Sequence, residues 1–502
     1  MKRKHRRLVQ VLAIVLVVLL VGGVIVSALI AALAEGQTAT TPERDRYELA
    51  IEYIDDRGAL HIGQRLVYGN RWQKHLDRVL FYAMPNMLRR QTALMYEPDD
   101  LSSVFPGGHA PGGIELASVR VDGEDADYGY EGTDELVLRV ACDLRPGEKA
   151  VFEFDYYLAL PYCRAFVGIG DLDVRLSAFY FIPGIYDPDR SEFVLNQPLS
   201  FTRWLYSGPA DYDVRITIPD GYALASVGVA SKEGGVWQIH AENVREYAVA
   251  FGRRWREKTR ETQNGPTIRL FSRLRDPDRI LDIVSRAISF CKGAFADDGF
   301  PVDQLTIVES DTPLDALDFP GLILLPSRLF DRGSGSELEQ QLRFCVAQQY
   351  IGISAYTEPS ADAWLSDSIC EYMSYLMLES EEGQDAFLNA INRDWVSALQ
   401  LTIPGGLRIT SDAKQFDSRE YDIVVRKRGA VVFHELRCAM GLEAFLDGIA
   451  RFYKQGRTGG TLTEMDLVAC MDAASNRSWE DFLTDWVFNV DEYVNQHIDW
   501  FE

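Results

Sequence analysis

The sequence predicts an α+β protein with an N-terminal transmembrane helix, an antiparallel β domain and then a mostly helical domain. Three observations predict this fold class. A long apolar run follows a basic N-terminal cluster, apolar and polar residues then alternate with period two to about residue 255, and helical periodicity follows from residue 276. The length of 502 residues, 47% of them apolar, allows more than one folded domain.

The N-terminal residues 1–35 are expected to be a membrane anchor. Val11 to Ala34 is a run of 24 residues in which only Ser27 is polar, long enough at about 1.5 Å per residue to cross a bilayer. The basic cluster from Lys2 to Arg7 predicts a cytoplasmic N-terminus, with the bulk of the chain extracytoplasmic. A single-pass cell-membrane protein is therefore expected, with residues 36–44 as a short stalk.

A cleaved, secreted form is the alternative to this anchor. Ala32-Leu33-Ala34 matches the small-x-small pattern of a signal-peptidase site. The apolar run is longer than the roughly 7 to 15 residues of a secretory h-region, which favours the uncleaved anchor.

Composition excludes some functions. The chain has 51 Lys and Arg against 75 Asp and Glu, a net charge of −24, and so acidic a surface repels phosphate backbones. We therefore expect no nucleic-acid partner. The seven cysteines are scattered singly without a CxxC pair, so neither a zinc ribbon nor a disulfide framework is indicated.

Residues 45–260 are expected to form the β domain. Apolar residues alternate with polar ones in the segments 47–53, 152–156 and 213–218, which is typical of half-buried antiparallel strands. Pro146-Gly147 and Pro219-Asp220-Gly221 supply turn residues between such segments.

Residues 261–502 are expected to form the mostly helical domain. Asp276 with Pro277 predicts the start of an amphipathic helix that continues through Ile288. A short strand is predicted at 305–308. Ser336 and Glu339 form a capping-box pattern for the next helix, and another helix is predicted to begin near Ala361.

These last two predicted helices carry a family resemblance. The segments Phe344-Cys345-Val346-Ala347-Gln348-Gln349-Tyr350-Ile351-Gly352 and Trp364-Leu365-Ser366-Asp367-Ser368-Ile369-Cys370-Glu371-Tyr372 resemble the zinc-binding core of the aminopeptidase N family of gluzincin metallopeptidases. That core reads HExxH-Q-W-W-G and then W-L-N-E-G-x-x-x-Y, with eighteen residues between the second His and the Glu ligand. Gln348 and Asp367 keep this separation.

Further segments resemble the same family in the same order. Residues 316–322 are similar to its GxMEN loop, and residues 427–432 to the segment after its catalytic tyrosine. Residues 181–187 and 211–219 resemble its saddle-shaped β domain. The resemblance thus implies a saddle-like β domain followed by a thermolysin-like, mostly helical domain.

The residues that carry out the family's chemistry are replaced. Carried over one by one, the three zinc ligands become Phe344, Gln348 and Asp367, the general base becomes Cys345, and the catalytic tyrosine becomes Arg426. A catalytic zinc needs about three protein donors, and Phe has no lone pair. The resemblance therefore implies a metallopeptidase fold without a metal cofactor and without peptidase activity, a pseudoenzyme.

One function of the family's site is expected to survive. The GxMEN glutamate, which grips the free amino terminus of a substrate in the family, corresponds to Asp318. Asp318 and Asp367 are therefore candidate peptide-binding residues that form an anionic pocket for an amine. The alternative is that both are residual carboxylates bonded to the backbone or to a basic neighbour.

Three other residues have alternative interpretations. Cys345 is either a nucleophile or a buried thiol, and no His lies in the aligned segments to activate it. A disulfide between Cys345 and Cys370 in place of the metal is a further possibility that the sequence leaves open. His434-Glu435 begins an HExx pattern that lacks its second His, which favours an ordinary helix residue over a ligand.

The expected function is thus that of a membrane-anchored extracytoplasmic pseudopeptidase that binds a peptide or protein partner at the cell surface. The chain ends soon after the helical stretch 461–486, without the family's large C-terminal helical arch, so the groove between the domains is expected to be open. Two alternatives remain. One is an active zinc metallopeptidase with unrecognised ligands, and the other is a structural subunit of an envelope complex.

Overall fold

The computed structural model describes residues 44–91, 95–296, 300–312, 316–331, 333–396 and 406–486. The chain divides into two compact units, Met1–Arg44 and Asp45–Glu502. The predicted anchor and, apart from Arg44, the predicted stalk lie outside the described residues. Among the helices of the described ranges, none combines the length and the apolar character that a membrane crossing requires.

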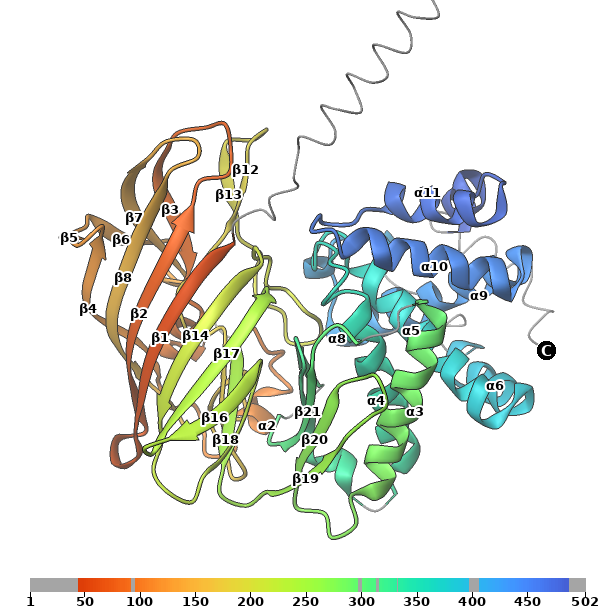
Figure 1. Ribbon diagram of the computed structural model, residues 1–502, viewed down its shortest axis with the longest axis horizontal. Helices are drawn as coiled ribbons and strands as arrows, with labels where there is room; N and C mark the ends of the chain where they lie inside the picture. Colours follow the sequence, from red (N-terminus) through yellow and green to blue (C-terminus); the bar gives the residue numbers. More distant parts are fainter. Residues whose placement is uncertain are drawn as a thin grey trace, which may run out of the picture. The chain divides into compact units, whose positions relative to one another are not determined.

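The first part of the second unit consists of β-sheets (Figure 1). Its largest sheet has eight strands in the order β16 (Val229–Glu233), β17 (Val236–Val244), β14 (Ala210–Thr217), β1 (Asp45–Ile54), β2 (Ala59–Gly69), β8 (Lys149–Ala159), β4 (Gly113–Val121) and β5 (Glu124–Asp125). Alternate residues of β1 are buried, which confirms the predicted period of two. The prediction that the strands are antiparallel is wrong for one pair of neighbouring strands, because β1 runs parallel to β14.

Smaller sheets and short helices complete this part. They are the sheet β15 (Ala223–Ser226), β18 (Ala248–Gly252), β10 (Val174–Ser177), β9 (Val167–Ile169); the sheet β11 (Ile182–Pro183), β3 (Leu76–Tyr82), β7 (Val137–Leu144), β6 (Tyr128–Glu131); the hairpin β12 (Ile185–Asp187), β13 (Glu192–Val194); and the helices η1 (Asp55–Arg57), η2 (Met84–Arg89) and α2 (Leu101–Val104).

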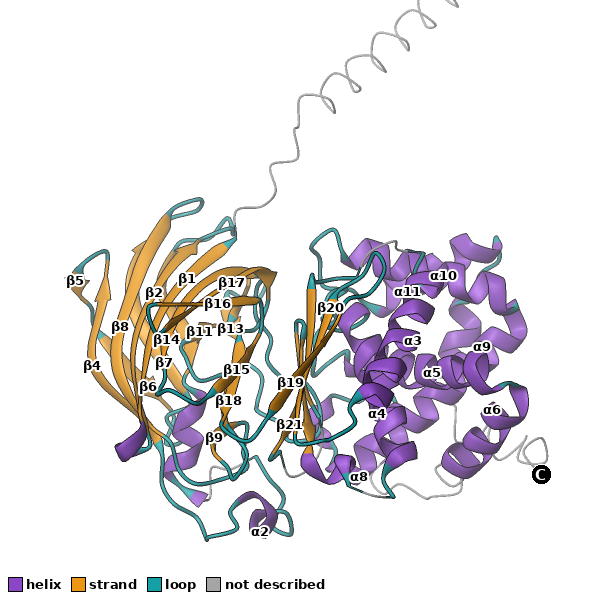
Figure 2. Cartoon of the chain, turned by 60° about the horizontal axis from the view of Figure 1, so that its bottom comes forward, coloured by secondary structure: helices purple, strands orange, loops and turns teal. Residues whose placement is uncertain are grey.

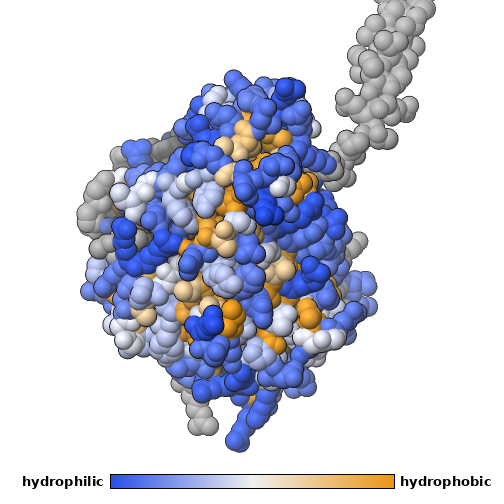
Figure 3. Space-filling view, turned by 90° about the vertical axis from the view of Figure 1, so that its left-hand side faces the viewer, coloured by the Kyte–Doolittle hydropathy of each residue, from blue (hydrophilic) through white to orange (hydrophobic). Residues whose placement is uncertain are grey.

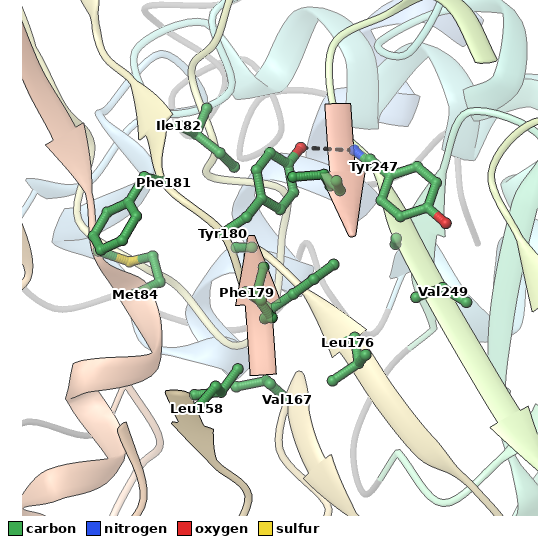
Figure 4. Packing of buried hydrophobic residues seen from close by; sticks show 14 of the residues in the cluster. Met84, Leu158, Val167, Leu176, Phe179, Tyr180, Phe181, Ile182, Tyr247 and Val249 are labelled. Atoms are coloured by element: carbon green, nitrogen blue, oxygen red, sulfur yellow. Dashed lines mark hydrogen bonds between the residues drawn. The ribbon is translucent and has the colours of Figure 1, made fainter. Parts of the chain in front are cut away.

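An aromatic core holds these sheets together (Figure 4). Phe179, Tyr180 and Phe181 are fully buried within it. The Tyr180 hydroxyl accepts a hydrogen bond from the backbone N–H of Tyr247 at 3.1 Å, so that its polar atom is satisfied inside the core. On the face seen in Figure 3, hydrophilic residues cover most of the surface and apolar residues form smaller patches.

The second part contains one more sheet and nearly all of the longer helices (Figure 2). The sheet has the order β19 (Arg256–Arg260), β20 (Thr267–Ser272), β21 (Gln304–Ser310), β23 (Leu322–Pro326), β22 (Leu317–Phe319). The helices are α3 (Asp278–Ala294), η4 (Ser327–Phe330), α4 (Gly335–Tyr350), α5 (Ala363–Glu382), α6 (Gln384–Ile391), η5 (Asn392–Val396), η7 (Ala413–Gln415), α8 (Ser418–Tyr421), η8 (Asp422–Arg428), α9 (Gly429–Met440), α10 (Leu442–Gly456) and α11 (Glu464–Ser475).

The five-stranded sheet separates two hydrophobic cores. Ile307 packs in the core of the helices, whereas its neighbour Val308 packs in the core of the β part. In the same way, Leu325 packs in the core of the helices and Leu324 packs in the core of the β part. Because successive side chains of a strand point to opposite faces, one sheet contributes to both cores, and its edge strand β22 lies where the two parts meet.

Strand β19, which lies within the residues 45–260 assigned to the β domain, pairs with β20 of the five-stranded sheet. Two predicted helix starts need correction. Helix α3 begins at Asp278, and Pro277 is its N-cap rather than its first residue. Helix α4 begins at Gly335 without a side-chain cap, which places Ser336 inside the first turn and removes the predicted capping box.

Candidate functional site

The residues predicted from the sequence converge on one cavity between the two parts. Helix α4 contributes Phe344 and Gln348, α5 contributes Asp367, β22 contributes Asp318 and η8 contributes Arg426. The segment 199–205, which connects β13 to β14, forms the opposite wall. The cavity has a volume of about 80 Å³ and is partly open to solvent.

Asp367 is the acceptor at the centre of a hydrogen-bond network. Its Oδ1 accepts from Gln348 Nε2 at 3.1 Å, and its Oδ2 accepts from Thr202 Oγ1 at 3.0 Å. The Tyr421 hydroxyl lies 2.8 Å from the same Oδ2 and 3.1 Å from Thr202 Oγ1. Ser366 Oγ lies 3.3 Å from Oδ1. The carboxylate thus joins α4, α5 and α8 to the wall of the β part.

An arginine stacks on the ring of Phe344, the residue that the sequence comparison aligned with the first zinc ligand. The Arg426 guanidinium carbon lies 4.1 Å from the centre of the Phe344 ring, within the range of a cation–π interaction. Arg426 Nη2 also donates to Glu371 Oε2 at 2.9 Å, and Lys427 bonds the other Glu371 oxygen. Burial opposes ionisation of Glu371, but Lys427 and Arg426 outweigh it and lower its pKa to about 2.

These residues do not fit a catalytic zinc ion. Zinc takes three lone-pair donors and keeps one open position. Here Phe344 offers no donor atom, Gln348 uses its amide N–H to bond Asp367, and Asp367 is already held by four hydroxyl and amide groups. Within the described ranges, no group of three or more His, Cys, Asp or Glu side chains is placed to hold a metal ion.

Asp318 is the carboxylate that faces the cavity without a complete set of partners. It is 8% exposed, and among the described residues its Oδ1 has no hydrogen-bond partner. Burial raises its pKa to about 7, an effect that Asp367 reinforces and that Cys345, Arg203 and Arg426 oppose. A cation entering the cavity would find an acceptor there that is already desolvated.

A third carboxylate among the described residues of this cavity was not predicted from the sequence. Glu246, between β17 and β18, is half-buried and lines the same space. Burial raises its pKa to about 7 and Arg203 opposes the shift. Ser200 also lines the cavity, and its buried hydroxyl has no partner among the described residues.

Of the remaining predicted residues, Cys345 and Cys370 are fully buried and His434 is half-buried. Cys345 is fully buried on α4, and burial, followed by Asp318, raises the pKa of its thiol well above the usual value, which opposes a nucleophilic role. All seven cysteines lie in described ranges and are free, so Cys345 and Cys370 are not bonded to each other. His434 packs between aromatic rings on α9, where burial lowers its pKa to about 4.

Sequence reasoning missed Thr202, Tyr421, Glu246 and the Glu371 ion pairs. Thr202 and Glu246 belong to connecting segments that carry no motif. Tyr421 follows the capping box of Asp417 and Glu420, and this local helix start was the one signal that pointed to an ordered residue there.

No family model matches the chain. Among curated proteins, the chain is similar to aminopeptidase N of Lactococcus lactis subsp. lactis, with 25% identity over 275 residues, which is 51% of this chain and 32% of that protein. It is also similar to aminopeptidase M1-D of Oryza sativa subsp. japonica, with 24% identity over 247 residues, 45% of this chain and 27% of that protein. The chain thus spans about a third of the length of these relatives.

Solved structures agree with these relatives. A mutant of an M1 zinc metallopeptidase from Deinococcus radiodurans matches with a TM-score of 0.63 and 17% identity, covering 89% of this chain and 94% of that one. A mutant of a two-domain M1 zinc metallopeptidase bound to L-arginine matches with a TM-score of 0.63 and 16% identity, over the same shares of the two chains. A mutant of the Deinococcus radiodurans protein bound to a Tyr-Ser-Ala substrate matches with a TM-score of 0.60, 17% identity and the same coverage.

Proposed function

We propose that this chain, which has the fold of the aminopeptidase N family, is a pseudopeptidase that binds peptides by a free amino terminus without hydrolysing them. The observation that carries the proposal is that the Asp367 carboxylate is fully engaged in hydrogen bonds. Its two oxygens accept hydrogen bonds from residues of α4, α8 and the segment before β14, in the position that corresponds to a zinc ligand in the family. The proposed replacement for the metal is therefore a set of hydrogen bonds.

Under this proposal the site also lacks the other two groups that hydrolysis requires. A metal-dependent peptidase needs a general base for the attacking water and a donor for the tetrahedral intermediate. The corresponding positions hold the buried thiol of Cys345 and the guanidinium of Arg426, which is engaged with Glu371 and Phe344. We propose that neither acts on a peptide bond.

The binding function rests on Asp318. Asp318 lines the cavity and its buried Oδ1 has no partner among the described residues, so an ammonium group that bonds it would form a charge-assisted hydrogen bond in a partly dehydrated site. Asp367 also lines the cavity but already accepts four hydrogen bonds, so we assign the amino terminus to Asp318. Solved relatives bound to L-arginine and to Tyr-Ser-Ala support a ligand with a free amino group.

The test is a peptide-library pull-down followed by titration of the best ligand with its amino terminus free and acetylated. Asp318→Asn is expected to weaken the free form by about tenfold or more, the value of a charge-assisted hydrogen bond, and to leave the acetylated form nearly unchanged. Mass spectrometry should recover the peptide intact. Equal losses for both forms would move the binding function elsewhere and favour the structural-subunit alternative. Cleavage of the peptide would favour the active-peptidase alternative.

We also propose that residues 1–35 anchor the protein in the cell membrane with the folded part outside the cytoplasm. The proposal rests on the apolar run 11–34 and on the basic residues before it. Under alkaline carbonate washing, the protein should stay in the membrane fraction with its N-terminal residues intact. A mature protein that begins at Glu35 would contradict the anchor.

A further inference from the structure

The cavity contains more negative charge than one amino terminus neutralises. Among the described residues, three carboxylates line it, those of Glu246, Asp318 and Asp367, together with two cations, Arg203 and Arg426. Arg426 compensates them only in part: it lowers the pKa of Asp318, but it is paired with Glu371 at 2.9 Å and lies 3.7 Å from Asp422.

The ion pairs around Arg426 form a neutral group of their own. Lys427 pairs with the other oxygen of Glu371, so Arg426 and Lys427 are balanced by Glu371 and Asp422. Among the described residues that line the cavity, Arg203 is the cation outside this group, and it lies with the three carboxylates. Fully ionised, this set has a formal charge of −2.

The two available carboxylates come from different parts of the protein. Asp318 lies on β22 and interacts with Cys345 of α4, whereas Glu246 follows β17 in the β part. Arg203 influences both, and its guanidinium donates to the carbonyl of Gly352 and lies 5.6 Å from the Tyr356 ring centre. The cavity thus presents one deeply buried and one half-buried acid to the same ligand.

We infer that the cavity selects peptides whose first residue is lysine or arginine, with the amino terminus at Asp318 and the side-chain cation at Glu246. The inference rests on the proposed function, since it names the peptides that the same site takes. Such a peptide brings two positive charges, which balance the formal charge of the cavity. Aromatic side chains of the wall, including Phe201 and Trp204, suit the methylene groups of a long basic side chain.

Protons are expected to take the place of these cations when no ligand is bound. The pKa values of Asp318 and Glu246 are both raised to about 7, so part of each carboxyl group is protonated near neutral pH. The charged groups that act on Asp318 are Arg203, Asp367 and Arg426, and Arg203 acts on Glu246. A dicationic ligand should therefore release more protons than a monocationic one.

The test uses the full-length protein in detergent and two peptides that differ only in the side-chain charge, Lys-Ala-Ala and norleucine-Ala-Ala. Near pH 8, the lysine peptide should bind about tenfold or more tightly than the norleucine peptide. Glu246→Gln should remove this advantage and leave norleucine-Ala-Ala unchanged within about twofold, whereas Asp318→Asn should weaken both peptides. Glu242→Gln, which changes an exposed carboxylate of β17, is the matched control and should change neither.

Calorimetry in buffers of different ionisation enthalpy gives a second readout that needs no variant. The lysine peptide should release more protons on binding than the norleucine peptide. Equal affinities and equal proton release for the two peptides would overturn the inference and leave the proposed function standing. Binding of neither peptide would contradict both. An equal loss of both peptides in a folded Glu246→Gln protein would also overturn the inference.

Discussion

At the scale of single residues, Asp318 combines a proposed binding role with a cost in stability. Its pKa is raised to about 7 by burial, whereas an unfolded Asp titrates near 3.9. At a pH between these two pKa values, Asp318 is protonated in the folded state and ionised in the unfolded state. The free energy of unfolding therefore falls as the pH rises through that range. From pH 5 to pH 8 this amounts to about 2–3 kcal/mol.

Asp318→Asn should remove this pH dependence. In urea unfolding experiments, the variant is expected to gain stability over the wild type as the pH increases from 5 to 8, because an amide stays neutral throughout. The comparison cancels all other titrating groups, Glu246 included. A constant difference between the two proteins across this range would show that Asp318 titrates normally.

The pKa of Glu371 is shifted in the opposite direction to that of Asp318. Burial raises the pKa of Glu371, but Lys427 and Arg426 have the larger effect and lower it to about 2. Its ion pairs therefore stabilise the fold above the unfolded pKa of about 4.3, and this contribution is lost as the pH falls towards 2. Glu371→Gln leaves two largely buried cations without their carboxylate and should cost about 3–5 kcal/mol at neutral pH.

Glu379→Gln, on the same helix α5, is the control for this prediction. Glu379 pairs with Arg437, but both side chains are more exposed than Glu371, at 23% and 17%. The loss of stability should be clearly smaller, as is usual for more accessible pairs. Similar losses of unfolding free energy in the two variants, measured by chemical denaturation, would show that the Glu371 ion pairs stabilise the fold no more than an accessible pair does.

At the scale of elements, Asp367 joins helices α4, α5 and α8 to the segment before β14. Asp367→Ala leaves buried donors on Gln348, Thr202 and Tyr421 without their acceptor, at about 1–3 kcal/mol for each donor that finds no substitute. Asp367→Asn keeps one carbonyl acceptor and should lose less. The midpoint of urea unfolding should therefore fall in the order wild type, Asn, Ala, and an Ala variant as stable as the wild type would contradict this role.

The sequence predicted these helices better than their contacts. The separation of Gln348 and Asp367 places them on two facing helices, where their side chains meet at 3.1 Å. Arg426, aligned with a tyrosine of the family, does reach the Phe344 ring. No pattern in the sequence indicated that Tyr421, five residues earlier, would bond Asp367, because that contact depends on the π-helical turn η8 and on how α8 packs.

At the scale of the whole second unit, the order of a β part and a helical part followed from the change of period in the sequence. The site was only partly predictable, because one wall belongs to irregular segments. Thr202 and Glu246 come from connections in the β part, whose path is set by packing against the helices and not by a local pattern. The parallel pairing of β1 with β14 was missed for a similar reason, since side-chain alternation does not specify strand direction.

The account as a whole depends on the claim that hydrogen bonds and ion pairs have replaced the metal of the family. The most direct measurement is the zinc content of the purified protein, prepared without chelator and dialysed against micromolar zinc. We predict well below one zinc ion per chain, because the three corresponding positions supply a phenyl ring, a hydrogen-bonded amide and a carboxylate that is already engaged. About one equivalent of zinc, lost in Asp367→Asn, would contradict the account.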